Sequence, residues 1–534
     1  MGLTSKLFGR RKAEAPIDGD TRPDDDTATA SNFNDDDSAM EIDSPNTSPE
    51  QVLSLKVTPK HDSIGIDAHD MVETQVCATL TACDIPDSAR SPIDLVVVLD
   101  ISGSMSGNKL QLCKETLELL IRVLQANDRF GLVVYGSHAT VKVPIQAMTA
   151  QNKEQALATI RAIRTSGMTN LSGGLSLAAQ EIKLIVNPNQ VQSIFLLTDG
   201  HANEGITSQE GLVELTKSIQ RTAGAGGASA KDEFVYVNAQ IPVHCFGYGS
   251  DHNSTILREI SNASGGGSYY FVDNDSNVKE AFGDAMGGML SVVAQSTVVK
   301  ISVPSHAAEL GVKINKVHHK EALRREDGSY TVSIGDFYAE ESRDVLLNVE
   351  LPKIVEDDES ETIPLYIPLV EVSASYTSVV ETNCGIVNSD PVTCFLSRPE
   401  GAEVSKADAH VMTQWLRIFV AQEIEQASQE GDRNQLEVAR NRLKEALVTV
   451  RKESQGWGES NDLIQSMIRD IELVQDGFAS TRQYQAAGGH YAKSRAKGYE
   501  YQRQSAPASY CMDDSISMAY RSAKKMNMAR KFKG

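Results

Sequence analysis

The feature of this sequence that most restricts its fold is an apolar run, Ile93–Leu99, followed by a regular alternation of strand and helix patterns. Such a run is typical of a strand buried on both faces of a parallel sheet. Apolar residues then recur at helical spacing from Leu110 to Leu124. Further strands are expected at 130–135, 193–198, 243–247 and 268–272, and further helices at 152–164, 172–186, 208–222 and 254–262. Residues 93–290 are therefore predicted to form a doubly wound, Rossmann-like α/β domain, a fold that binds ligands at the carboxyl ends of its strands.

Two stretches on either side of this domain alternate apolar and polar residues at period two, the pattern of half-buried strands. They are residues 51–84 and 296–396. The first stretch is too short to be stable alone, so we expect it to pair with the second in one β-sandwich. The α/β domain is then inserted into that sandwich. Residues 405–480 carry apolar stripes at helical spacing and are expected to form a small helical bundle.

The two ends of the chain carry opposite charge. Residues 13–50 hold twelve acidic residues and one arginine, so we expect residues 1–50 to be a disordered acidic tail. Residues 481–534 hold eleven Lys or Arg and three acidic residues, interleaved with tyrosines. This basic, tyrosine-rich segment is expected to be a largely disordered, solvated tail. Its mixture of basic and aromatic residues leaves RNA or an acidic partner open as an alternative.

The chain of 534 residues has 51 Lys plus Arg against 72 Asp plus Glu, a net charge of −21. This excess of negative charge disfavours DNA as a partner. Seven cysteines without a C-x-x-C spacing disfavour a disulfide scaffold and a zinc finger, and they fit a reducing compartment. The sequence has no apolar stretch as long as a transmembrane segment and no secretory pattern at its N-terminus. The expected location is therefore the cytoplasm.

Oxygen-bearing side chains follow the predicted strands of the α/β domain. Asp100, Ser102 and Ser104 come directly after the first buried strand. Thr169 stands in a second loop, and Asp199 ends another buried strand. Because the carboxyl ends of parallel strands meet at one edge of the sheet, these three loops are expected to converge. Carboxylates and hydroxyls are hard ligands, suited to a small divalent cation.

These residues lie in the motifs D-x-S-x-S, G-x-T-N-L-S-G-G-L and L-L-T-D-G, which together resemble the complete metal-ion-dependent adhesion site of the von Willebrand factor A domain family. The resemblance implies that Ser102 and Ser104 bind Mg²⁺ or Mn²⁺ directly, and Thr169 directly or through water. It implies that Asp100 and Asp199 act chiefly through bound water. Neutral hydroxyl ligands leave the cation electrophilic at an open position. The expected occupant of that position is an Asp or Glu of a partner protein.

Catalytic alternatives find little support in the same residues. A haloacid-dehalogenase-type phosphatase needs a second aspartate where Ser102 stands, and the sequence has neither a G-x-S-x-G elbow nor a phosphate-binding P-loop. Helix capping by Ser102 and Ser104 is a simpler interpretation, but it does not account for Thr169 and Asp199 together. His201 is a candidate only for the rim of the site. We therefore expect a non-enzymatic adaptor that binds other proteins.

A second resemblance covers residues 296 to about 500. A β-sandwich followed by helices that contain Val411–Arg417 is similar to the Vwaint-like module that accompanies intracellular A domains, some of which also carry a RING, U-box or Hedgehog/intein-type (Hint) domain. This sequence lacks the zinc-ligand spacing of a RING, and residues 1–50 are too short and too acidic for a U-box. The alternative to a free-standing adaptor is therefore a substrate-recognition component, or a catalytically lapsed relative, of such ubiquitin ligases.

Overall fold

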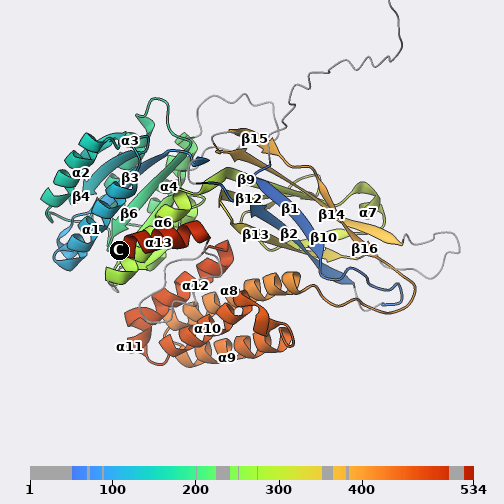
Figure 1. The fold of residues 1–534 in the computed structure, drawn as a ribbon. Helices are drawn as coiled ribbons and strands as arrows, with labels where there is room; N and C mark the ends of the chain where they lie inside the picture. The colour runs from blue at the N-terminus through green and yellow to red at the C-terminus, as the bar shows by residue number, and fades with distance from the viewer. Residues whose placement is uncertain are drawn as a thin grey trace, which may run out of the picture. The chain divides into compact units, whose positions relative to one another are not determined.

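The structure is a computed structural model that describes residues 51–533 except for 69–71, 87–88, 200, 224–240, 250–251, 273–274, 352–364, 381–383 and 504–521. The predicted acidic tail, 1–50, lies outside the described residues. Three parts follow from the described elements: an α/β domain, a β-sandwich and a set of C-terminal helices (Figure 1).

Within the described residues, the α/β domain is built on a six-stranded sheet in the order β5-β4-β3-β6-β7-β8. Its strands are β3 (Ile93–Asp100), β4 (Arg129–Tyr135), β5 (Ala139–Ala147), β6 (Val191–Thr198), β7 (Val243–Tyr248) and β8 (Tyr269–Val272). β5 runs antiparallel to β4, and the other neighbours are parallel. Every residue of β3 is buried, as a central strand covered on both faces requires. The prediction of a doubly wound α/β domain is confirmed.

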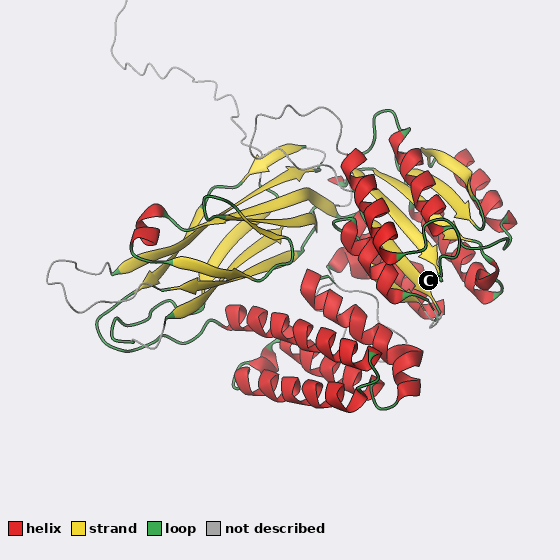
Figure 2. Ribbon diagram, turned by 180° about the vertical axis from the view of Figure 1, so that it is seen from behind, coloured by secondary structure: helices red, strands yellow, loops and turns green. Residues whose placement is uncertain are grey.

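Helices cover both faces of this sheet (Figure 2). They are α1 (Asn108–Val123), α2 (Ala150–Ala162), α3 (Leu171–Lys183), α4 (Gln209–Ala223), α5 (Ser254–Ala263) and α6 (Asp275–Met289). Val96 and Val98 of β3 share an apolar core with α3, α4 and α5. Leu95 and Val97 share a second core with α1, α2 and α6. Successive side chains of a strand point to opposite faces, so the apolar run of β3 supplies both cores.

In the part of the chain that the structure describes, the β-sandwich consists of two sheets with the strand orders β1-β2-β13-β10 and β11-β12-β9-β14-β15, and β16 also pairs with β14. The bounds are β1 (Leu53–Pro59), β2 (Glu73–Ala82), β9 (Val292–Ser302), β10 (Lys313–Val317), β11 (Ala322–Arg324), β12 (Tyr330–Tyr338), β13 (Ser342–Glu350), β14 (Tyr366–Ser378), β15 (Gly385–Asn388) and β16 (Val392–Ser397), with a short helix α7 (Ser305–Glu309) after β9. β2 pairs with β13 along its length, from Thr81 opposite Ser342 to Glu73 opposite Glu350. The α/β domain therefore lies between two strands of one sandwich in the sequence.

The C-terminal helices begin with α8 (Ala409–Asp432), α9 (Leu436–Glu453) and α10 (Asp462–Gly477). The side chain of Asp408 accepts a hydrogen bond from the Val411 amide and caps α8. Asn461 caps α10 in the same way, by accepting from the amides of Leu463 and Ile464. Across the described residues, no helix combines the length and the hydropathy needed to cross a membrane.

The segment predicted as a largely disordered basic tail, 481–534, differs from that prediction where the structure describes it. It forms α11 (Thr481–Gln483), a π-helical turn (Tyr484–Gly488), α12 (Gly489–Tyr501) and α13 (Ala523–Lys533). The hydroxyls of Tyr491 and Tyr499 are buried and donate to the two carboxylate oxygens of Asp470, at 2.9 and 2.6 Å. These two tyrosines, which suggested an RNA-binding surface, therefore belong to the core of the helical bundle. Their hydroxyl groups can be buried because a buried carboxylate accepts hydrogen bonds from them.

The last helix, α13, packs on α6, the last helix of the α/β domain (Figure 1). Glycine permits this close contact. A Cβ atom added to Gly283 would lie 2.5 Å from the Cα atom of Ala529, and one added to Gly287 would lie 2.8 Å from the Cα atom of Lys525. The C-terminal helix is thus seated on the α/β domain by a backbone approach that larger residues would prevent.

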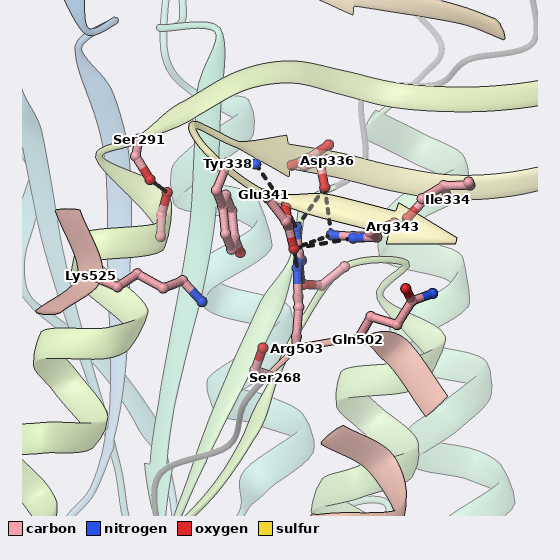
Figure 3. Close-up of polar contacts among 12 residues, drawn as sticks. Ser268, Ser291, Ile334, Asp336, Tyr338, Glu341, Arg343, Gln502, Arg503 and Lys525 are labelled. Carbon is pink, nitrogen blue, oxygen red and sulfur yellow. Dashed lines mark hydrogen bonds and ion pairs between the residues drawn. The ribbon is translucent and has the colours of Figure 1, made fainter. Parts of the chain in front are cut away.

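A buried charge cluster joins the end of α12 to the sandwich (Figure 3). Glu341 accepts hydrogen bonds from Arg343 and from Arg503, at 3.0 and 2.9 Å. The backbone carbonyl of Asp336 also accepts from both guanidinium groups. Burial would raise the pKa of Glu341, but the two arginines outweigh it and lower the pKa to about 2. The carboxylate is therefore charged at neutral pH and ties the C-terminal segment to β12 and β13.

Candidate metal centre

Asp100 ends β3, and its carboxylate is enclosed by donors from neighbouring strands. One oxygen, Oδ1, accepts from the backbone amide of Ser102 at 2.8 Å. The other, Oδ2, accepts from the hydroxyls of Thr198 at 2.8 Å and Tyr135 at 3.3 Å. Burial raises the pKa of Asp100, and the nearby Asp199 carboxylate adds to the rise. Asp100 thus fixes the loop that follows it, and its own oxygens are largely occupied by hydrogen bonds.

The two predicted serine ligands lie side by side in this loop. A single 3-10 turn, Gly103–Met105, brings the Oγ atoms of Ser102 and Ser104 to 3.1 Å from each other. Met105 is fully buried and anchors the turn in the core. Adjacent ligands of an octahedral Mg²⁺ ion lie about 3.0 Å apart, given metal–oxygen distances of about 2.1 Å. The spacing of the hydroxyls therefore fits two ligands of one such ion.

The loop that carries Thr169 is tied to both other loops. Its Gly167 carbonyl accepts from the Gly103 amide at 3.3 Å. Thr169 donates its amide to the side chain of Asn203 at 2.8 Å and accepts from the Asn203 amide at 3.1 Å. The threonine is 3% exposed. The sequence motifs did not single out Asn203, which connects the Thr169 loop to the loop after β6.

Asp199 follows β6 and is completely buried. Its Oδ2 atom lies 3.2 Å from the ammonium group of Lys109, at the start of α1. Its Oδ1 atom has no hydrogen-bond partner among the residues that the structure describes. A buried carboxylate oxygen left without a partner is costly, and a bound cation or a water on that cation would satisfy it. The donor set and this oxygen therefore fit a divalent cation.

Lys109 is a second residue that sequence reasoning missed. Its ammonium group places one positive charge beside Asp199, and a second buried carboxylate, Asp100, lies near Asp199. The remaining charge is negative and attracts a cation. Its position in the first turn of the helix after D-x-S-x-S was the available signal, because that turn faces the same edge of the sheet.

Among the residues that the structure describes, a cysteine and a histidine are near this set in space or in sequence. Cys113 of α1 is fully buried near Asp100 and Asp199, and burial together with those carboxylates raises the pKa of its thiol to about 12. His201 is exposed, in the loop after β6. The donors that converge are hydroxyl and carboxylate oxygens, the ligands preferred by Mg²⁺ and Mn²⁺.

The amino-acid sequence of residues 94–284 matches the family described as von Willebrand factor type A domain. The chain contains a von Willebrand factor type A (VWA) domain. The match begins in β3 and ends in α6, so it includes the sheet and the three polar loops.

Curated relatives of the chain share this region. The E3 ubiquitin-protein ligase WAV3 of Arabidopsis thaliana is 29% identical over 266 residues, which are 50% of this chain and 32% of that protein. The uncharacterized protein YfbK of Escherichia coli is 28% identical over 210 residues, which are 39% of this chain and 33% of that protein. The chain thus spans about a third of the length of these two relatives.

Solved structures share the fold over more than the VWA domain. A von Willebrand factor type A protein from Catenulispora acidiphila has a TM-score of 0.58 at 16% identity, covering 80% of this chain and 91% of that one. The ArnB paralog VWA2 from Sulfolobus acidocaldarius has a TM-score of 0.50 at 13% identity, covering 84% and 99%. At these identities the likeness concerns the fold alone.

Proposed function

We propose that the VWA domain binds a partner protein through a Mg²⁺ or Mn²⁺ ion. In this proposal the hydroxyls of Ser102, Ser104 and Thr169 hold the ion. The observation that carries the proposal is the pair of serine hydroxyls 3.1 Å apart in a site whose buried Asp199 keeps one oxygen without a hydrogen-bond partner among the described residues. An Asp or Glu side chain of the partner completes the coordination.

The hydrogen bonds of the site support this role. Asp100 already accepts from three donors, and Asp199 shares its charge with Lys109. Neither carboxylate is therefore free to neutralise the ion fully, and both act through bound water. Because the directly binding hydroxyls are neutral, the ion keeps affinity for an external carboxylate. The role is non-enzymatic, and we place it in the cytoplasm.

A second candidate function comes from the names of relatives. WAV3 and WAVH1 of Arabidopsis thaliana are both named E3 ubiquitin-protein ligases, and their matches cover 50% and 49% of this chain. On this alternative, the chain is a substrate-recognition component of a ligase or a relative that has lost catalysis. The sandwich and the C-terminal helices would then correspond to the Vwaint-like module that the sequence resembles.

Affinity capture with the full chain as bait tests the first proposal. Partners should be retained in Mg²⁺ and lost in EDTA, and Ser102→Ala combined with Ser104→Ala should lose them in Mg²⁺ as well. Ser106→Ala is the matched control, because this exposed serine directly follows the 3-10 turn. Retention of the same partners by the double variant would refute the proposal. Ubiquitin transfer by the purified chain with conjugating enzymes would refute the non-enzymatic role.

A further inference from the structure

A second cluster of metal-ligand side chains lies in the β-sandwich, outside the VWA domain. Cys77 and Thr79 stand two residues apart on β2, Asp344 lies opposite Thr79 on β13, and His410 belongs to the first turn of α8. The ligand atoms of Cys77, Asp344 and His410 all lie within 4.8 Å of one another. Three chain segments that are distant in the sequence therefore bring a thiol, a carboxylate and an imidazole together.

One carboxylate oxygen is the centre of this cluster. Oδ1 of Asp344 accepts from the Thr79 hydroxyl at 2.5 Å and from the Cys77 thiol at 3.5 Å, and it lies 2.7 Å from Nε2 of His410. The thiol and the imidazole become metal ligands when they lose the protons that now point at this oxygen. The cluster thus resembles a metal site without its cation, in which hydrogen bonds between the ligands replace the bonds to the metal.

We propose that Cys77, Asp344 and His410 bind a Zn²⁺ ion, with a water as fourth ligand and the Thr79 hydroxyl still donating to Asp344. Sulfur, nitrogen and a single carboxylate oxygen form a donor set that suits zinc and not magnesium. In a tetrahedral zinc site, a thiolate sulfur and a carboxylate oxygen lie about 3.5 Å apart. The observed separation of these atoms in Cys77 and Asp344 is also 3.5 Å.

The imidazole is the ligand that has to move. A nitrogen and an oxygen bound to one tetrahedral zinc ion lie about 3.3 Å apart, so Nε2 of His410 must shift by about 0.6 Å. The side chain of His410 is 46% exposed, which leaves it room to do so. Asp344 is held in place instead, because its amide donates to Gln502 and its carbonyl accepts from Gln502, both at 2.8 Å.

The cluster is reached from solvent through a cavity of about 270 Å³ whose lining includes Asp344, His410 and Gln414. This cavity has room for a water as fourth ligand. On the far side, Cys77 is completely buried and packs with Val411 of α8. Burial raises the pKa of the Cys77 thiol well above its usual value, so binding of the ion must release that proton. The ion would link the first turn of α8 to β2 and β13.

Cobalt substitution of the full chain tests the site. The protein is stripped with a chelator, kept in excess Mg²⁺ to occupy the hard-oxygen site of the VWA domain, and titrated with Co²⁺. We expect one equivalent of Co²⁺ to give a thiolate-to-cobalt charge-transfer band and tetrahedral d–d bands, which Zn²⁺ then abolishes. Cys77→Ser should remove the charge-transfer band. Cys394→Ser, a buried cysteine of the same sandwich outside the cluster, should leave it intact.

A second variant guards against misfolding of Cys77→Ser. His410→Ala removes a partly exposed side chain but also a partner of the buried Asp344 carboxylate, so it should remain folded with a somewhat lower melting temperature without metal, which circular dichroism measures. We expect it to weaken Zn²⁺ binding at least tenfold in competition with a chromophoric chelator, whereas His306→Ala, an exposed histidine of the same sandwich, should not. Absence of the charge-transfer band at saturating Co²⁺, its persistence in Cys77→Ser, or unchanged Zn²⁺ affinity in His410→Ala would each overturn the proposal.

Discussion

The guanidinium group of Arg503 lies 2.9 Å from the carboxylate of Glu341, although 162 residues separate them in the sequence. Arg343 approaches the same carboxylate from its own strand at 3.0 Å. All three side chains are almost completely buried, and both guanidinium groups point at the carboxylate (Figure 3). A buried carboxylate between two guanidinium groups is destabilised when either is removed, so this contact ties the C-terminal segment to the sandwich.

Arg503→Gln should destabilise the protein by about 3 kcal/mol, because it removes one partner of a buried ion cluster. Arg343 still donates to Glu341 in this variant, so the loss of free energy of unfolding should lie near the lower end of the range for removing one partner of a buried ion pair. Urea unfolding followed by circular dichroism measures the difference. Arg325→Gln is the control, since Arg325 is exposed and its side chain donates to Thr331 at the surface. An equal, small effect of both changes would show that the Arg503 contact does not stabilise the fold.

The same cluster predicts a dependence of stability on pH. The pKa of Glu341 is lowered from 4.5 to about 2 in the folded chain. A group with a depressed folded pKa contributes its full stability above its unfolded pKa and loses it as the pH falls toward the folded value. The natural protein should therefore have a higher free energy of unfolding than Glu341→Gln. This difference should shrink by about 3 kcal/mol as the pH falls from about 5 to about 2.

Denaturant titrations of both proteins at several pH values measure this margin. Glu350→Gln is a suitable control, because Glu350 ends β13, the strand that begins directly after Glu341, and its carboxylate is not among the hydrogen-bond partners of the two arginines. A margin that stays constant across the range would mean that Glu341 is not held charged by its arginines.

The parts of the fold that sequence analysis predicted correctly are those whose signal is local. The apolar run of β3 requires burial on both faces, and it therefore predicts the doubly wound sheet. The structure places α12 in a bundle instead of a disordered tail because Tyr491 and Tyr499 meet Asp470, a partner more than twenty residues away. Charge and tyrosine content cannot reveal such a partner.

The same distinction applies to the candidate metal centre. The motifs predict Ser102 and Ser104 together because a fixed spacing within one turn sets the distance between their hydroxyls. Asn203 and Lys109 have no such spacing to Thr169 and Asp199, since the strand topology brings them there. A residue that reaches a site from another loop can be predicted only when the order of the strands in the sheet is known.

Lys109 should oppose binding of a divalent cation, because its ammonium group lies 3.2 Å from Asp199. Lys109→Gln removes one positive charge beside the site and should raise the affinity for Mn²⁺ about tenfold, a gain of about 1.4 kcal/mol. Titration calorimetry measures the affinity. The control is Lys142→Gln, which removes the same charge from an exposed lysine of β5 in the same domain. It should change the affinity for Mn²⁺ little. Weaker binding in Lys109→Gln would show that the lysine organises Asp199 for the ion and does not compete with it.

Tyr499 tests whether the segment after residue 480 is part of the folded core. Its hydroxyl donates to Asp470 at 2.6 Å, so Tyr499→Phe leaves a buried carboxylate oxygen with one hydrogen bond fewer. The expected cost is about 2 kcal/mol, since hydrogen bonds to charged groups contribute more than neutral ones. Tyr366→Phe is the control, because Tyr366 is exposed at the start of β14. Equal urea midpoints for Tyr499→Phe and the natural protein would favour the solvated tail that the sequence suggested, because a hydroxyl in solvent contributes nothing to folding.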